Sequence, residues 1–168
     1  NVGASAPEYR GSYFAWGETS IQSAPTSYWE SSEYTWDWYK WCNSEDYLTK
    51  YCTDSRYGLP DNKTTLELSD DVAHVKWGGR WRMPTKEELT ELHEKCKWEM
   101  TTLNGQKGYK LIGDNGNYIF MPAADRMWCG KLGYVDHGYY WSSSLNISEN
   151  NYAWILHFEQ DWYRACIT

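Results

Sequence analysis

The chain has 168 residues, enough for one domain with its own hydrophobic core and too few for two full ones. Its formal net charge is −7 and its sequence pI is about 5.1, so it lacks the basic surface by which proteins hold nucleic acid or anionic membrane. It also contains no long apolar run. We therefore expect a single domain over 1–168 with no nucleic-acid partner and no membrane span.

Aromatic residues set this composition apart. The 12 Trp, 15 Tyr and 3 Phe make 18% of the chain aromatic, while the mean hydropathy is −0.80. Rings that carry N–H or O–H groups can anchor loop backbone. The first part of the chain, 1–65, is rich in Gly, Pro, Ser and Asp and shows neither helical nor strand periodicity. It predicts long loops that aromatic rings pin to the body of the domain.

Two helices are predicted after these loops. Ser69 is a suitable N-cap for a short helix over 69–77, which two glycines end. A second helix is expected over 85–97, because Thr85 and Glu88 have the spacing of a capping box. Its apolar stripe consists of Leu89, Leu92 and Cys96.

Four strands follow the helices in the predicted order. A hairpin is expected where the turn residues "DNGN" separate two short apolar segments. Loops, then helices, then a small antiparallel sheet indicate an α+β fold. The expected strands span 108–113, 117–122, 138–143 and 152–158.

The last of these strands, with the sequence "AWILHF", alternates in a way that assigns its two faces. Its inward residues are predicted to be Trp154, Leu156 and Phe158, which leaves Ile155 and His157 on the outward face. The predicted core consists of Trp81, Leu89, Leu92, Trp141, Trp154, Leu156 and Phe158.

The cysteines and histidines show no catalytic or zinc-binding spacing. There are five cysteines and four histidines, without a CxxC pair, a nucleophile elbow, a phosphate loop or HExxH. The sequence therefore predicts neither a zinc site nor an enzyme. An odd number of cysteines also argues against a disulfide framework, although the sequence allows one or two disulfide bridges in an oxidising compartment.

An acidic and amide-rich stretch offers oxygen ligands of the kind that Ca²⁺ prefers. It lacks EF-hand spacing, so a solvated acidic loop is the alternative. The stretch is a candidate site for a structural Ca²⁺, the only cofactor that the sequence suggests, with Asp54, Asp61, Asn62 and Asp70 as its candidate ligands.

Several segments resemble, in order, the Fibrobacter succinogenes major paralogous domain, which is common in Bacteroides-type gut bacteria. They are "PEYRGSYFAWGET", "YKWCN", "GGRWRMPT", "HGYYWSSS" and "NNYAWILHF". The resemblance covers nearly the whole chain. It implies a C-type lectin-like fold of the branch shared with formylglycine-generating enzyme and with variable proteins of diversity-generating retroelements. That fold has two helices on a small antiparallel sheet, with long packed loops.

The family pattern includes a strand upstream of Asn1 and another downstream of Thr168. Neither is in this sequence, so the chain either lacks these terminal strands or continues beyond its ends. The sugar-coordinating tripeptides of calcium-dependent lectins do not occur here. The implied fold therefore carries no expectation of sugar binding.

In retroelement variable proteins, the last strand and the loop after it form the ligand-facing surface. The resemblance places that variable region at 146–168. We expect Ile155, His157, Trp162, Tyr163 and Arg164 to form one continuous accessible surface, joined by early loop aromatics such as Trp29 or Trp36. The ligand-binding residues it implies are Tyr152, Ile155, His157, Trp162, Tyr163, Arg164, Cys166 and Thr168.

The genetic code gives a partial check on this assignment. Randomising the adenines of an Asn codon produces Tyr, Ile, His, Arg, Cys or Thr, which covers Tyr152, Ile155, His157, Arg164, Cys166 and Thr168. It cannot produce Trp162, Glu159, Gln160 or Glu149.

The resemblance implies a non-enzymatic binding module for a protein or cell-surface ligand, with a hypervariable face. Its expected location is secreted, on the cell surface or on a phage tail. Two alternatives stay open: a non-diversified structural or adhesin paralogue of a surface lipoprotein, and an oxidase like formylglycine-generating enzyme. The oxidase needs a cysteine pair near the end of the domain, where only Cys166 lies, with Cys129 well upstream.

Overall fold

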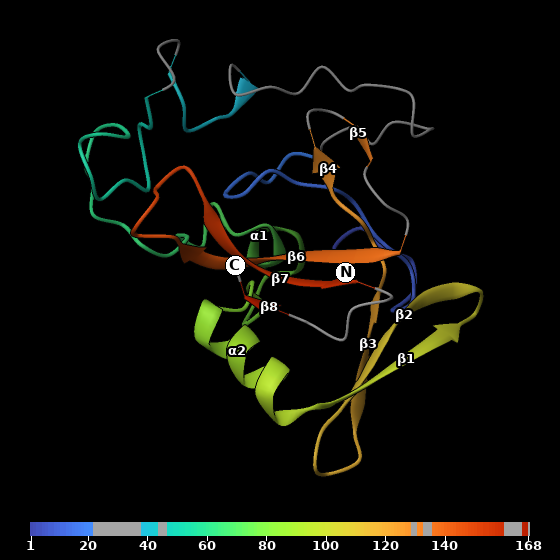
Figure 1. The fold of residues 1–168 in the computed structure, drawn as a ribbon. Helices are drawn as coiled ribbons and strands as arrows, with labels where there is room; N and C mark the ends of the chain where they lie inside the picture. Colours follow the sequence, from blue (N-terminus) through green and yellow to red (C-terminus); the bar gives the residue numbers. More distant parts are fainter. Residues whose placement is uncertain (22–37, 44–46, 129–130, 133–135, 160–165, 168) are drawn as a thin grey trace.

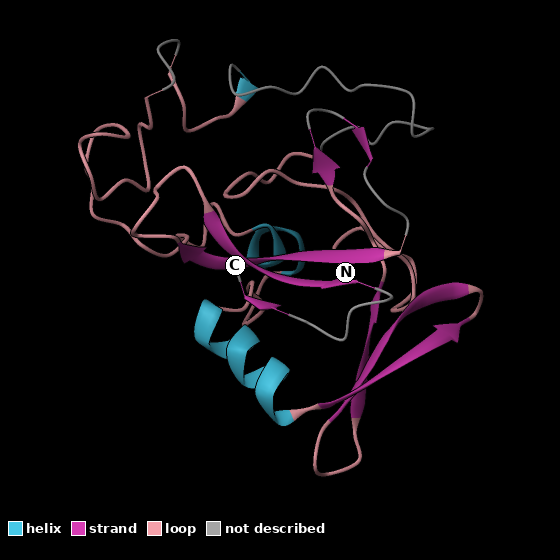
Figure 2. Cartoon of the chain, in the orientation of Figure 1, coloured by secondary structure: helices cyan, strands magenta, loops and turns pink. Residues whose placement is uncertain are grey.

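Loops, two helices and antiparallel sheets follow one another along the chain in the computed structural model (Figures 1 and 2), which describes residues 1–21, 38–43, 47–128, 131–132, 136–159 and 166–167. This order confirms the α+β class. The elements are α1 (Val72–Trp77), α2 (Lys86–Lys95), β1 (Lys97–Leu103), β2 (Gln106–Ile112), β3 (Tyr118–Pro122), β4 (Met127–Trp128), β5 (Lys131–Leu132), β6 (His137–Leu145), β7 (Ala153–Glu159) and β8 (Cys166–Ile167).

The two helices begin at different kinds of cap. The capping box of α2 is confirmed, because the Thr85 side chain accepts from the Glu88 amide and the Glu88 side chain from the Thr85 amide. In α1 the predicted cap was wrong. Asp71, not Ser69, accepts from the amide of His74, and its other carboxylate oxygen accepts from the amide of Met83. Asp71 thus joins the start of the helix to the segment before α2.

The first sheet is antiparallel in the order β1–β2–β3. β2 and β3 correspond to the predicted hairpin. β1 was not predicted; it begins where the second helix was expected to end. Asn104 and Gly105 join β1 to β2 with φ angles of 47° and 80°, the left-handed conformation that tight hairpin turns require.

A second three-stranded sheet has the order β6–β7–β8, so β7 is its central strand. The ladder between β6 and β7 shifts register between Trp141 and Leu145. Helix α2 contacts all three strands. In Figure 1 it lies on one side of this sheet and the N-terminal loops lie on the other. The strands β4 and β5 form a separate small ladder.

Two hydrophobic clusters flank the β6–β7 ladder. One joins Leu89 of α2 to Leu111 of β2 and to Leu156 and Phe158 of β7. The other joins Leu145 and Ala153, at the far end of the ladder, to the loops through Trp16, Tyr51 and Leu66. The β6–β7 ladder therefore ties the helical layer to the loop layer.

The predicted core is correct in three residues, partly correct in two and wrong in two tryptophans. Leu89, Leu156 and Phe158 are buried, whereas Trp81 is 62% exposed and Trp141 is 40% exposed. Trp141 lies on the face of β6 that points away from the core cluster, so its predicted place in the core was wrong. The remaining two residues, Leu92 and Trp154, are partly buried.

Aromatic side chains anchor the N-terminal loops to distant parts of the chain, as their abundance predicted. The indole Nε1 of Trp16 donates to the carbonyl of Ser142 at 2.8 Å, 126 positions away in the sequence. The Tyr13 hydroxyl donates to the carbonyl of Ala124 at 2.5 Å. These bonds fix loop backbone that has little regular secondary structure.

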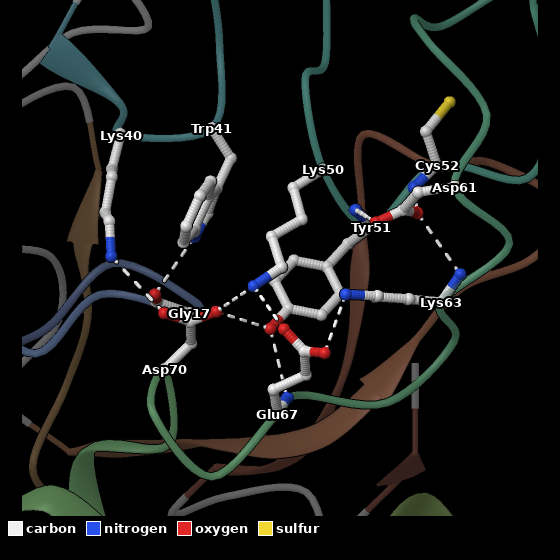
Figure 3. A network of polar contacts seen from close by, with 10 residues as sticks. All are labelled: Gly17, Lys40, Trp41, Lys50, Tyr51, Cys52, Asp61, Lys63, Glu67 and Asp70. Carbon is white, nitrogen blue, oxygen red and sulfur yellow. Dashed lines mark hydrogen bonds and ion pairs between the residues drawn. The ribbon is translucent and has the colours of Figure 1, made fainter.

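A polar network under the loops is centred on the buried carboxylate of Asp70 (Figure 3). Asp70 accepts from Lys50 Nζ at 2.5 Å, from the Tyr51 hydroxyl at 2.7 Å and from Lys40 Nζ at 3.3 Å. Lys50 also pairs with Glu67, whose amide donates to the Tyr51 hydroxyl. The network joins the loop segment before α1 to the aromatic cluster around Tyr51.

Neither of the described helices has the length and apolar character needed to cross a lipid bilayer.

Candidate functional site

One face of the β6–β7 ladder carries an unusual set of side chains, which we call the ladder face. Leu156 and Phe158 occupy the opposite, core-facing side of β7, so the residues between them point away from the core. The register pairs each of these residues with a partner on β6, because directly opposed residues share a face. The resulting three pairs are His137 with Glu159, Tyr139 with His157, and Trp141 with Ile155.

Stacked rings hold the middle of the ladder face. The rings of Tyr139 and His157 stack with centroids 4.2 Å apart and planes 12° apart. His137 lies beside both, with centroid distances of 6.1 Å to Tyr139 and 5.7 Å to His157. The guanidinium of Arg126 lies over the Tyr139 ring, 4.6 Å from its centroid. The face is therefore a packed, partly covered surface.

The side chain of His157 is 17% exposed, less than those of His137 (21%) and Glu159 (35%). Its Nε2 atom is buried and makes no hydrogen bond to the described residues, although it lies 3.3 Å from Glu159 Oε1. Burial lowers the pKa of His157 below its ordinary value, and the nearby Glu159 carboxylate offsets only part of that effect. The imidazole is therefore neutral at neutral pH.

Three potential metal ligands converge at this point. His137 Nδ1 lies 3.8 Å from Glu159 Oε1, and one ligand atom from each of His137, His157 and Glu159 falls within 4.8 Å of the others. His137 Nδ1 is also 3.3 Å from the Tyr139 hydroxyl. No other group of three or more such side chains occurs in the part of the chain that the structure describes.

The structure places the predicted ligand-binding residues unevenly. Ile155 and His157 share the ladder face, but both are partly buried and not freely exposed. Tyr152 is 56% exposed in the turn before β7. The backbone of Cys166 pairs with that of His157 across β7 and β8. The remaining predicted residues lie outside the described part of the chain: Trp29, Trp36, Trp162, Tyr163, Arg164 and Thr168.

The predicted calcium ligands have partners within the protein. Asp54 binds Arg56, Asp70 binds two lysines and a tyrosine, and Asp61 accepts from the amides of Tyr51, Cys52 and Lys63. Their carboxylates do not converge among the described residues. The fourth residue, Asn62, is exposed with a φ of 57°. The calcium site stays a prediction, which a calcium titration would test.

Four of the six ladder-face residues were not predicted: His137, Tyr139, Trp141 and Glu159. His137, Tyr139 and Trp141 alternate along β6 just as Ile155, His157 and Glu159 do along β7. The alternation of "HGYYW" was a usable signal for an outward face, but the cross-strand pairing that brings His137 to Glu159 depends on register.

Comparison with protein-family models, with curated proteins and with solved structures gives no match to this chain.

Proposed function

We propose that this chain is a ligand-binding module with a C-type lectin-like fold, and that the ladder face forms part of its recognition surface. The observation that supports this proposal is the ladder face itself. It carries two histidines, a tyrosine and a tryptophan on hydrogen-bonded strands whose opposite side is core. Aromatic side chains on a rigid support cover large areas with few rotatable bonds, which is why they dominate protein interfaces.

The proposed ligand is a protein or another component of a cell surface. Trp141 is 40% exposed at one end of the face and pairs with Ile155, so an apolar contact is available there. The other end carries the His137, His157 and Glu159 cluster and supplies polar contacts. An apolar patch beside polar groups suits a folded protein surface. The module would act outside the cell or on a phage tail.

Binding to intact gut bacterial cells tests the recognition surface. We would compare the fluorescently labelled chain with the double variant Trp141→Ala/Ile155→Ser. The matched control, Trp81→Ala/Ile119→Ser, removes a tryptophan and an isoleucine that are 62% and 49% exposed and lie off the ladder face. We expect the ladder-face variant to lose at least about tenfold in affinity for the cells that the wild type binds, and the control to retain it.

Thermal melting of all three proteins separates recognition from folding. If the ladder-face variant binds as the wild type does, or if both double variants lose binding equally, the ladder face is not the recognition surface.

Diversification by a retroelement forms a separate part of the proposal and has its own test. The gene neighbourhood should contain a reverse transcriptase and a near-copy of the 3′ end of the coding sequence. The codons for Tyr152, Ile155 and His157 should be adenine-rich in that copy. A neighbourhood that contains neither the reverse transcriptase nor the near-copy would favour the non-diversified structural or adhesin paralogue.

A further inference from the structure

We propose that His137, His157 and Glu159 form a binding site for a divalent transition-metal ion, with Zn²⁺ as the preferred ion. The site lies on the ladder face between β6 and β7. It does not depend on the proposed recognition function, because the three side chains could bind a metal whether or not the face also binds a partner.

Two of the three separations between the ligand atoms are close to those around one tetrahedral ion, and the third is within 4.8 Å. Glu159 Oε1 lies 3.3 Å from His157 Nε2 and 3.8 Å from His137 Nδ1. Zn²⁺ binds histidine nitrogen and carboxylate oxygen at about 2.0–2.2 Å, which places neighbouring ligands of a tetrahedron about 3.4 Å apart. Rotation of the two imidazoles toward Glu159 would place an ion between the three atoms.

A bound ion would also provide a partner for a buried atom. His157 Nε2 is buried and makes no hydrogen bond to the described residues, a state that folded proteins rarely leave unexplained. A neutral imidazole nitrogen is a good ligand for Zn²⁺ and a poor one for Ca²⁺ or Mg²⁺, which prefer oxygen. Two imidazoles and one carboxylate leave a fourth position for water or for a group of a bound partner.

The fold holds these side chains in place before any metal arrives. His137 and Glu159 are direct partners in the ladder, and His157 lies two residues before Glu159 on the same face. The Tyr139 ring stacks on His157 and restricts the rotation of its imidazole. A site on paired strands needs little reordering when it binds an ion.

One neighbouring group opposes the ion. Arg126 lies over Tyr139, the ring that stacks on His157, and its positive charge repels a cation bound in this cluster. The Arg126→Gln variant keeps all three ligands and removes that repulsion. We therefore expect it to bind Zn²⁺ more tightly than the wild type does.

Isothermal titration of the metal-stripped full chain with Zn²⁺ tests the site directly. We expect one equivalent to bind, and the affinity to fall at least about 100-fold in His157→Gln and in Glu159→Gln, because losing even an outer partner of a metal ligand costs 10–100-fold. The controls are His74→Gln and Glu99→Gln, which change a histidine and a glutamate away from the cluster. Circular dichroism melting identifies any variant that has not folded.

Cobalt substitution distinguishes this site from adventitious binding to the five cysteines. Co²⁺ bound by nitrogen and oxygen gives visible ligand-field bands without the near-ultraviolet charge-transfer band that a thiolate ligand produces. A thiolate band would overturn the proposal, as would a wild type that binds no Zn²⁺. Unchanged affinity in the folded Glu159→Gln variant, whose glutamate side chain is 35% exposed in the wild type, would also overturn it.

Discussion

Asp70 shows how a buried charge is stabilised at the scale of one residue. Its side chain is 4% exposed, and burial alone would raise the pKa of this carboxyl. Hydrogen bonds from Lys50, Tyr51 and Lys40 outweigh burial and lower the pKa of Asp70 below its ordinary value. A carboxyl with a lowered folded-state pKa contributes stability above its unfolded-state pKa, 3.8, and loses it as the pH falls further.

We therefore expect Asp70→Asn to lower the free energy of unfolding by about 2–3 kcal/mol at neutral pH, because the lysines lose a charged acceptor. Urea unfolding at several pH values between neutral and about pH 3 measures this loss. The difference between wild type and variant should shrink as the pH falls below 3.8. Asp114→Asn, in the exposed β2–β3 turn, is the control. A difference that stays constant with pH would show that the charge of Asp70 is not what stabilises the fold.

Residue identity alone predicted burial well for aliphatic side chains and poorly for tryptophan. Leu89 and Leu156 are buried as expected, whereas Trp81 and Trp141 are exposed. Leucine has no polar atom, so water is rarely its better environment. Tryptophan has an N–H that can bind loop backbone from the surface, as Trp141 Nε1 does toward the carbonyl of Phe14. In a chain with so many tryptophans, local pattern cannot separate the two roles.

At the scale of the element, the capping box stabilises the first turn of α2. Thr85→Ala removes the oxygen that accepts from the Glu88 amide and should cost about 1 kcal/mol. In a domain of this size the melting temperature should fall by about 2–4 °C. Thr85→Ser keeps the oxygen and should melt close to the wild type. Equal melting of the Ala and Ser variants would show that the cap contributes little.

The strand that was missed shows the limit of local pattern at this scale. The sequence of β1, "KWEMTTL", alternates only over its first four residues, and of its side chains Trp98 packs against the core cluster. It lies at the edge of its sheet and is held by pairing with β2 and by the contacts of Trp98 with Tyr109 and Phe158. The Asn104-Gly105 dipeptide was the available signal, because such pairs favour the hairpin turn that joins β1 to β2.

At the scale of the whole molecule, β7 should be the last segment to exchange its amide hydrogens. It is the central strand of its sheet, and Leu156 is fully buried in the cluster that joins α2 to the first sheet. Opening it requires breaking the β6 and β8 ladders together. Hydrogen exchange followed by mass spectrometry should show slow exchange at β7 and faster exchange at β1. Equal rates in both strands would contradict this view of the core.

Only two of the six ladder-face residues could be predicted from the sequence, because the face depends on how the strands pair. Alternation along β7 placed Ile155 and His157 on one side. The approach of His137 to Glu159 depends on the register between β6 and β7, which the packing of the whole sheet decides. The candidate metal ligands lie in two strands separated by a loop. No single stretch of sequence therefore contains their spacing.

The hydrogen bond between Trp16 and Ser142 has a consequence for the order of events during synthesis. Residue 16 leaves the ribosome long before residue 142, so Trp16 has no hydrogen-bond acceptor at Ser142 until β6 has been made. Contacts between distant residues also slow folding, because closing the intervening chain costs entropy. The aromatic loops are thus the part of the nascent chain exposed to water the longest. Until Ser142 of β6 has been made, the hydrogen bond that fixes Trp16 cannot form, and the apolar surface of these loops can associate with other chains.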